Sequence, residues 1–599
     1  MSIALGMYTE LAGSSPSAAF SRVISLVYKP VLSFLYNNPG TKFSMYQSAA
    51  VMKYLSQSYP EVNMLIAALA KRSDLEIVTG TYSQAILSLN PPKDRSMQIE
   101  RMTTLIRRYY GIKASSCFFY GQIWAPSFIH SLRNTGISSV VISAYRATTR
   151  EKVATSSFVM NELGKRVDMR IISDEGAQLF SRYAQSEITL DELESGLMNV
   201  MDTSDDDVVF FSIDQMLEGS ARQGDDERIS DVLIRIISHR RGCLLSDIPC
   251  ERPGYLDSGW YGRDAYAQGL YSFNDIFVRN ENFRYLLNRY IALSETVSQF
   301  KKDRNAKREA EAALFHISIG PLFIHDAQCT PMRQAERRSF WKAIIEAEES
   351  LIDSDSQALK SEYDYEEIGM NDYAARGKMF NAVFSPKGGA VAELCYKPLA
   401  LNIIDTRVPF DISFPHIELN KTFSDSVHIN GRDVQLASEI FDSEVVSRTR
   451  GEYQFTYASD SFTLIKHFRM RSQTLILEST IIPEEDVTGS YTVYAYLSMS
   501  DMILTSSDQR RQMMLGSLDD VRTVRYTENL SGLTVSFSST EPFSVAEEKA
   551  RQSQNTSIGN ESFELYTKLS FSFPIEIRKG EARTIRFILR ASDSRKDRE

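Results

Sequence analysis

The feature that most constrains the fold is a strand–helix–strand pattern in the first quarter of the chain. The run Cys117–Pro126 reads as a buried strand leading into a helix that starts at Pro126 and stops at Gly136. A second apolar run, Ser139–Ser143, follows at once. Proline at the start and glycine just past the end are typical helix boundaries. This β-α-β unit predicts parallel strands.

The same alternation continues on both sides of this unit. It predicts an α/β barrel-like domain over residues 1–250. In such barrels the chemistry lies at the carboxyl ends of the strands. Here that end is Tyr120–Trp124, which carries no acidic side chain. We expect further strands at 2–7, 42–46, 75–78, 169–172 and 208–212.

The second half of the chain has a different character. Residues 251–351 begin with an aromatic, glycine-rich stretch that includes Trp260 and continue with helical periodicity. Residues 352–375 are acidic and serine-rich, which favours a linker. Residues 376–599 alternate at period two between turn residues, which predicts a β-sandwich.

Charge excludes some partners. The 599 residues carry a net charge of −10 without a long basic stretch, so we expect neither nucleic acid nor an anionic membrane as partner. No segment is expected to span a membrane, because the apolar stretch 20–36 is interrupted by Arg22, Lys29 and Pro30. A homodimer is compatible with the sequence.

Cysteine and histidine usage points to a cytoplasmic protein without a metal. The five cysteines are odd in number and scattered, which fits a reducing compartment, although Cys243 and Cys250 lie close enough in sequence for a local bridge. His316 and His325 lie nine residues apart beside Asp326, but a metal site needs a further ligand at better spacing. We therefore expect no cofactor.

Several strings in a fixed order resemble glycoside hydrolase family 57, in the branch of α-amylases and 4-α-glucanotransferases. The order and spacing of these strings are more specific than any one of them. They are Leu75–Val78 with Met97–Met102, Gln122–Pro126 with Leu132–Ile137, Phe273–Asn280, Arg337–Ile345, and Phe384–Gly389 with Tyr396–Pro398. The resemblance implies a (β/α)7-type barrel, a helical segment and a C-terminal β-sandwich, and a retaining mechanism on α-glucans.

The resemblance also assigns the catalytic positions. The family's glutamate nucleophile falls on Gly121, which cannot attack, and its neighbour Gln122 is an amide. The family's general acid falls on Asp214, where the nearby family glutamate is replaced by Met216. The family's first histidine motif falls on 8–10, where Glu10 stands without any histidine.

Other positions are candidates for substrate binding, each with a plainer alternative. Trp124 is either a sugar-stacking platform or part of the barrel core. Tyr82 lies in a family string in which the carboxylate is replaced by Gln84. Trp260 forms either a mobile aromatic wall or a packed contact between domains. Glu10 is either a displaced carboxylate in the same cleft or a capping residue.

Two functions of different class follow. The first is a catalytically impaired relative of α-glucan-processing enzymes that binds a glucan, a maltooligosaccharide or a protein partner. The second is an active transferase or amylase that pairs Asp214 with a displaced carboxylate, such as Glu10 or Asp174. A second carboxyl within about 6 Å of Asp214 would favour the active enzyme, because retaining chemistry needs two carboxyls close together.

Overall fold

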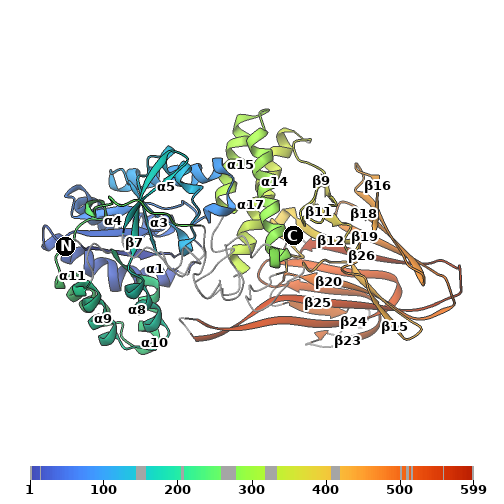
Figure 1. Ribbon diagram of the computed structural model, residues 1–599. Helices are drawn as coiled ribbons and strands as arrows, with labels where there is room; N and C mark the ends of the chain where they lie inside the picture. Colours follow the sequence, from blue (N-terminus) through green and yellow to red (C-terminus); the bar gives the residue numbers. More distant parts are fainter. Residues whose placement is uncertain are drawn as a thin grey trace.

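The computed structural model shows three parts in a row (Figure 1). An α/β barrel, blue to green in Figure 1, is followed by upright helices and then by a large β-sandwich. This order confirms the expected fold class of barrel, helical segment and sandwich. The described residues are 3–11, 13, 15, 17–143, 157–203, 208–257, 278–317, 334–355, 357–406, 419–499, 502–506, 512–513, 517–556 and 559–595.

Seven parallel strands of the described chain form the barrel wall, in the order β3-β2-β1-β8-β7-β5-β4. The sheet closes because Thr79, directly after β3, makes 2.8 Å backbone hydrogen bonds to Ser116 and Phe118 of β4. An eighth strand, β6, pairs antiparallel with β7. The strands are β1 (Ala4–Thr9), β2 (Phe43–Gln47), β3 (Leu75–Val78), β4 (Ser116–Phe118), β5 (Ser139–Ser143), β6 (Phe158–Glu162), β7 (Lys165–Ile172) and β8 (Val208–Ser212).

Helices cover the outside of the barrel (Figure 1). The longest of them, α5, follows the expected boundary rules: it starts at Pro92 and ends before Gly111, whose φ of +71° suits glycine. The helices are α1 (Ser17–Val23), α2 (Lys29–Asn37), α3 (Ala49–Ser58), α4 (Pro60–Lys71), α5 (Pro92–Tyr110), α6 (Phe128–Asn134), α8 (Asp174–Ala184), α9 (Leu190–Thr203), α10 (Ile213–Gln223) and α11 (Ile229–His239).

The chain after β4 differs from the prediction. A tight 3-10 turn, Tyr120–Gln122, comes first, and α6 begins two residues after Pro126. The expectation of a strand running directly into a helix that starts at Pro126 was wrong. The reason is local, because Gly121 with φ +63° and Gln122 with φ +57° turn the backbone before the helix can begin.

Aromatic rings fill the middle of the barrel. The ring of Phe118 lies 4.7 Å from Tyr8, 4.8 Å from Tyr46 and 5.6 Å from Phe210, between ring centres. Gly6 makes room for this packing, since a Cβ atom there would lie 2.2 Å from the Phe210 ring. The barrel is therefore a packed core, and only its rim is available for chemistry.

The stretch Ser17–Asn37 corrects one expectation. By length and composition alone it could span a membrane, with a mean hydropathy of 1.3 over its most apolar window, although we expected no such segment. In the fold, Val27, Val31 and Leu35 of this stretch are fully buried in the hydrophobic core beneath the barrel strands. The apolar face formed by these residues is therefore covered by other parts of the barrel domain.

The helical part agrees with the sequence pattern. It consists of α14 (Glu281–Gln299), α15 (Arg304–Ile317) and α17 (Gln334–Ser354). One hydrophobic cluster joins these helices to the barrel through Ile86, Tyr120 and Ile123, and to the C-terminal part through Val383 and Cys395. The helices thus hold the two outer parts of the described chain together.

The C-terminal part is built from two antiparallel sheets. A smaller sheet has the order β13-β12-β11-β10-β9, and a larger one has the main order β15-β14-β20-β25-β24-β26-β19-β18-β17-β16. The strands are β9 (Glu362–Tyr363), β10 (Asp372–Arg376), β11 (Phe380–Ser385), β12 (Ala390–Tyr396), β13 (Leu401–Asn402), β14 (Ser424–Ile429), β15 (Arg432–Gln435), β16 (Asp442–Ser447), β17 (Glu452–Ala458), β18 (Phe462–Met470), β19 (Thr474–Pro483), β20 (Val487–Leu497), β21 (Met502–Ser506), β22 (Gln512–Met513), β23 (Ser517–Glu528), β24 (Leu533–Thr556), β25 (Gly559–Ile577) and β26 (Arg583–Asp593).

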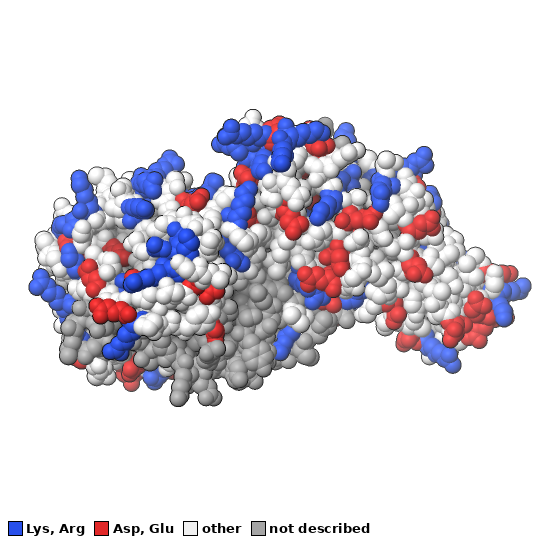
Figure 2. Space-filling view, turned by 45° about the horizontal axis from the view of Figure 1, so that its top comes forward, with Lys and Arg blue, Asp and Glu red and all other residues white. Residues whose placement is uncertain are grey.

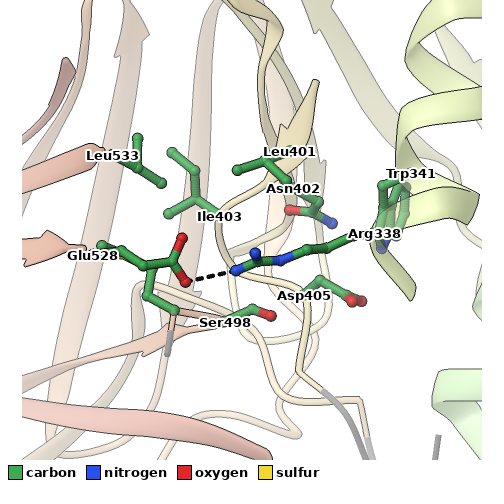
Figure 3. Close-up of a pocket in the computed structure, with 10 residues that line it drawn as sticks. Arg338, Trp341, Leu401, Asn402, Ile403, Asp405, Ser498, Glu528 and Leu533 are labelled. Carbon is green, nitrogen blue, oxygen red and sulfur yellow. Dashed lines mark hydrogen bonds and ion pairs between the residues drawn. The ribbon is translucent and has the colours of Figure 1, made fainter. Parts of the chain in front are cut away.

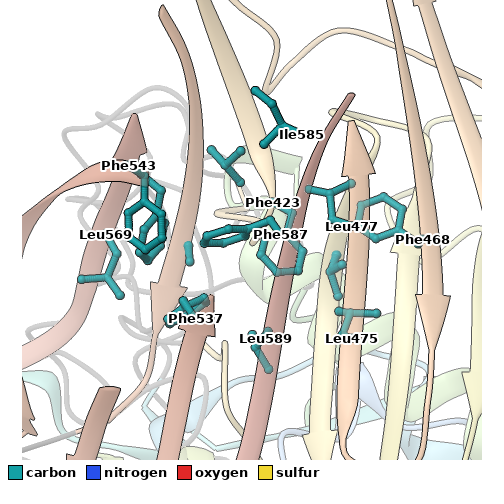
Figure 4. Close-up of a cluster of buried hydrophobic side chains, with 14 of the residues drawn as sticks. Phe423, Phe468, Leu475, Leu477, Phe537, Phe543, Leu569, Ile585, Phe587 and Leu589 are labelled. Carbon is teal, nitrogen blue, oxygen red and sulfur yellow. The ribbon is translucent and has the colours of Figure 1, made fainter. Parts of the chain in front are cut away.

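Phenylalanine dominates the sandwich core (Figure 4). Phe587 lies at its centre, 4.8 Å from Phe571, 5.8 Å from Phe537 and 5.9 Å from Phe423, between ring centres. These side chains face inward from alternate positions of their strands, as the period-two pattern predicted.

The linker expected at 352–375 contains ordered structure. β9 and the first residues of β10 belong to the smaller sheet, and Tyr365 and Asp372 are buried. The linker interpretation was therefore wrong for this stretch, because the tyrosines in it supply apolar surface that composition alone understates. The remaining domain boundaries stay a prediction.

Candidate functional site at the barrel rim

Glu10 is the centre of a hydrogen-bonded cluster at the carboxyl ends of the strands. It follows the last residue of β1, and its backbone N–H donates to Asp214 Oδ2 at 2.6 Å. Its carboxylate oxygen Oε1 accepts the backbone N–H of Gly121 at 3.0 Å. Its carbonyl oxygen accepts Gln84 Nε2 at 2.6 Å. One residue therefore connects the loops that follow β1, β3, β4 and β8.

By the resemblance, Gln84 replaces a carboxylate of the family, and its amide suits the hydrogen bonds of this cluster. The Glu10 carbonyl needs a donor, and an ionised carboxylate at position 84 could only accept and would face that oxygen with like charge. The amide of the side chain supplies the N–H. Sequence reasoning noted the exchange at position 84 but did not find the Glu10 carbonyl, which lies 74 residues away.

Asp214 stands in the first turn of α10, directly after β8. Burial raises the pKa of its carboxyl to about 6, an effect that the N–H of Glu10 partly offsets and the charge of Glu218 reinforces. A carboxyl with a pKa near neutrality suits a general acid. The backbone N–H nevertheless occupies one of its oxygens.

A second set of polar contacts lies beside this cluster. The side chain of Gln122 accepts the N–H of Ser143 at 2.8 Å and donates to the carbonyl of Phe119 at 3.1 Å. The Ser143 hydroxyl donates to Asp174 Oδ1 at 3.0 Å. Asp174, the alternative partner considered for Asp214, is thus hydrogen-bonded to the residue that ends β5.

Below the cluster, the hydroxyl of Tyr46 is buried and has no hydrogen-bond partner among the described residues. Burial raises the pKa of Tyr46 well above its ordinary value, and the negative charge of Glu10 adds to this shift. The aromatic floor of the rim is therefore neutral.

The barrel can now be compared with known proteins. Residues 10–185 match the family model described as Glycosyl hydrolase family 57. The chain is therefore similar to this family over its barrel. Glycosyl hydrolase family 57 was the resemblance inferred from the sequence, and its (β/α)7-type barrel is the barrel described above.

Relatives agree with this assignment. The 4-alpha-glucanotransferase of Thermococcus kodakarensis is 23% identical over 428 residues, which is 63% of this chain and 62% of that relative. Alpha-amylase 1 of Dictyoglomus thermophilum is 22% identical over 172 residues, 28% of this chain and 25% of the relative. The chain thus spans less than two thirds of the curated relatives that it matches.

A solved structure agrees in fold over nearly the whole chain. The crystal structure of 4-alpha-glucanotransferase from Thermococcus litoralis superposes with a TM-score of 0.76 at 16% identity. It covers 98% of this chain and 99% of that one. At this identity the likeness establishes the fold of all three parts.

The family match relates the rim cluster to the positions that the resemblance assigned. By the resemblance, Gly121 occupies the position of the family's nucleophile and Asp214 that of its general acid. The structure places Glu10 between them, with its side chain on Gly121 and its backbone on Asp214. Glu10 is therefore the carboxylate to consider as a partner of Asp214. The other candidate, Asp174, is hydrogen-bonded to Ser143.

Trp124 does not form a platform for sugar. Only 1% of it is exposed, it packs against Phe119 and Phe128, and its Nε1–H donates to the carbonyl of Leu256 at 3.1 Å. Of the two interpretations of Trp124, the structure supports barrel core. Trp260 lies outside the described residues, as do His325 and Asp326.

Tyr82 is half-buried on the rim, in the loop that also carries Gln84. Its ring lies edge-on to Phe315 of α15 at 5.7 Å, and Lys53 and Arg101 flank it. Sequence reasoning singled out Tyr82 but missed the two cations, because α3 and α5 come together only in the folded barrel. Among the described residues, no cluster of three or more His, Cys, Asp or Glu side chains could hold a metal ion.

A separate pocket lies where α17 packs against the sandwich (Figure 3). Arg338 crosses it and pairs with the buried Glu528 at 2.6 Å. Trp341 Nε1 and Asn402 Nδ2, two buried donors in its lining, have no partner among the described residues. The pocket is polar, lies outside the barrel and belongs to the junction of two parts.

Proposed function

We propose that the protein binds an α-glucan or maltooligosaccharide at the barrel rim without the retaining chemistry of its family. The match of the barrel to glycosyl hydrolase family 57 supports a role in glucan metabolism. The observation that carries the proposal is the side-chain-free Gly121 at the position that the resemblance gives to the nucleophile. A retaining glycosidase needs one carboxylate to attack and a second carboxyl to protonate the leaving oxygen.

The contacts of the two rim carboxyls support the loss of this chemistry. Glu10 uses Oε1 to accept the N–H of Gly121, and Asp214 uses Oδ2 to accept the N–H of Glu10. Both side chains therefore hold loops together, and this structural role accounts for them without a reaction. The partly exposed side chain of Tyr82 remains as an aromatic surface that a sugar ring can contact.

A second candidate function is active α-glucan transfer or hydrolysis with Glu10 as the nucleophile. Two observations favour it. The Glu10 carboxylate lies against the backbone of Gly121, and the pKa of Asp214 is raised to about 6, as a general acid requires. In this case Glu10 would attack the anomeric carbon while Asp214 protonates the leaving oxygen.

Binding is tested by isothermal titration calorimetry of the full chain with maltoheptaose. We expect saturable binding that Tyr82→Ala weakens about tenfold, because one sugar–aromatic stack contributes on the order of 1 kcal/mol. Tyr36→Ala is the control, since Tyr36 is an exposed tyrosine that also lies beside an arginine, Arg72. Absence of binding at millimolar maltoheptaose would contradict the proposal.

The cellular setting is inferred on separate grounds. Cys117, Cys243, Cys250 and Cys395 are free thiols, which supports the reducing, cytoplasmic compartment expected from the sequence. The local bridge between Cys243 and Cys250 does not form.

A further inference from the structure

Two cations converge on one aromatic ring at the edge of the barrel rim. Lys53 Nζ of α3 lies 4.7 Å from the centre of the Tyr82 ring. The guanidinium carbon of Arg101, on α5, lies 4.9 Å from the same centre and 4.6 Å from the ring of Phe315 on α15. Three helices and the loop after β3 therefore meet at this point.

The positive charge of this group is not neutralised within the described chain. Neither Lys53 nor Arg101 has an ion-pair partner among the described residues, whereas Lys93 on the same helix α5 pairs with Glu311 at 3.2 Å. The neighbouring His316 feels this charge, since partial burial and then Lys53 and Arg101 lower its pKa. Figure 2 shows basic side chains along the boundary between barrel and helices.

The pKa of the Tyr82 hydroxyl shows that the two cations favour a negatively charged oxygen. Burial alone would raise the pKa of the phenol, but hydrogen bonds from Lys53 and Arg101, and their charges, bring it below its ordinary value. Both cations therefore favour negative charge on the phenol that lies between them and the rim. A guanidinium and an ammonium together are the pair that proteins commonly use for phosphate, the first as a two-pronged donor and the second as a point charge.

We propose that Lys53, Arg101 and Tyr82 form a binding site for a phosphate group, either free or carried by a sugar. The loop connects this site to the rim cluster, because Gln84, two residues after Tyr82, holds the backbone of Glu10. A glucan end or monosaccharide bound at the rim would extend a phosphate toward the two cations. The sugar part of this inference rests on the proposed function, and the phosphate part does not.

The experiment measures binding of three probes to the full chain by calorimetry at about 50 mM salt, where charge contacts are weakly screened. The probes are glucose 1-phosphate, inorganic phosphate and glucose. The test variant is Lys53→Gln with Arg101→Gln. The control is Arg107→Gln with Arg108→Gln, which removes the same charge from exposed positions of α5. Melting temperatures of all variants check folding.

We expect wild type and control to bind a phosphate probe alike, and the test variant to lose at least tenfold in affinity. Tyr82→Phe keeps the ring and should lose less, because only one hydroxyl contact disappears. Tighter binding of glucose 1-phosphate than of inorganic phosphate would identify a sugar phosphate as ligand. Equal affinity would identify free phosphate, and either result supports the site.

Two results would overturn the site. One is the absence of phosphate binding by the wild type. The other is equal phosphate binding by the test variant and the control. If the melting temperature of the test variant alone were then lowered, the two cations would serve only to hold α15 on the barrel. Failure of maltoheptaose binding with intact phosphate binding would refute the proposed glucan function and leave this site standing.

Discussion

At the scale of single residues, the contact between Glu10 and Gly121 distinguishes the rim of this barrel. A side chain that the resemblance places at position 121 is missing, and the Glu10 carboxylate, from the loop after β1, lies against that backbone instead. The positive φ of Gly121 favours glycine, since other residues are strained there. Loss of the side chain and the new contact therefore form one local arrangement.

The raised pKa of Asp214 predicts a pH-dependent stability. Its pKa is about 6 in the folded protein and near the ordinary value of 3.8 when unfolded, so the folded state binds the proton more tightly. The stabilisation is complete below about pH 4 and is lost as the pH rises through 6. Asp214→Asn cannot ionise and keeps an acceptor for the N–H of Glu10.

We therefore expect Asp214→Asn to gain stability relative to wild type by about 1–2 kcal/mol between pH 4 and pH 7, allowing for partial exposure of the carboxyl. Urea unfolding at both pH values measures this difference. A difference that is the same at pH 4 and pH 7 would show that the carboxyl does not titrate in this range.

At the scale of elements, a buried charge network ties the helices to the smaller sheet. Arg289 of α14 pairs with Glu348 of α17 at 3.0 Å and with Glu393 of β12 at 2.8 Å, and all three are almost fully buried. Burial alone would raise the pKa of Glu348, but Arg289 and Arg376 hold it below its ordinary value. Both carboxylates thus have Arg289 as their main partner, and Arg376 adds a weaker contact to Glu348.

Removing that guanidinium should be costly. Arg289→Met leaves Glu348 and Glu393 buried without their main partner, and we expect a loss of about 3–5 kcal/mol in the free energy of unfolding. Arg235→Met is the control, because Arg235 is exposed and its pair with Glu194 should contribute less than about 1 kcal/mol. Chemical denaturation compares the two, and similar losses would mean that the buried network is no stronger than a surface pair.

Elements were predictable where the signal is local. Fully buried parallel strands such as β5 and β8 are short continuous apolar runs, and the sandwich strands alternate, so both kinds were found from the sequence. The turn at Tyr120–Gln122 was missed, because two consecutive residues with positive φ leave little trace in composition. The linker was misjudged because Tyr365 gains its burial from distant helices.

The site was less predictable than the fold for the same reason. The contacts that define it join Glu10 to Gly121 and Asp214, which lie 111 and 204 positions away in the chain. Alignment with a family motif identified the positions, but only the folded rim shows which backbone groups the carboxyls bind. The burial of Trp124 likewise depends on Leu256, far along the chain.

At the scale of the whole molecule, the barrel, helices and sandwich form one continuous body. The hydrophobic cluster of α14, α15 and α17 reaches into both neighbours, and Asp94 of α5 accepts hydrogen bonds from Tyr290 and Ser294 of α14 at 2.6 and 2.7 Å. The family's three-part architecture is thus retained around an altered rim. A homodimer stays a prediction.

The central claim is that this protein binds α-glucan without hydrolysing or transferring it. The most direct test is long incubation of the full chain with maltoheptaose, with the products resolved by mass. We predict that the substrate is recovered unchanged, with Glu10→Gln and Asp214→Asn giving the same result as wild type. Shortened or redistributed chains that appear with wild type and vanish in both variants would contradict the claim and establish Glu10 and Asp214 as a catalytic pair.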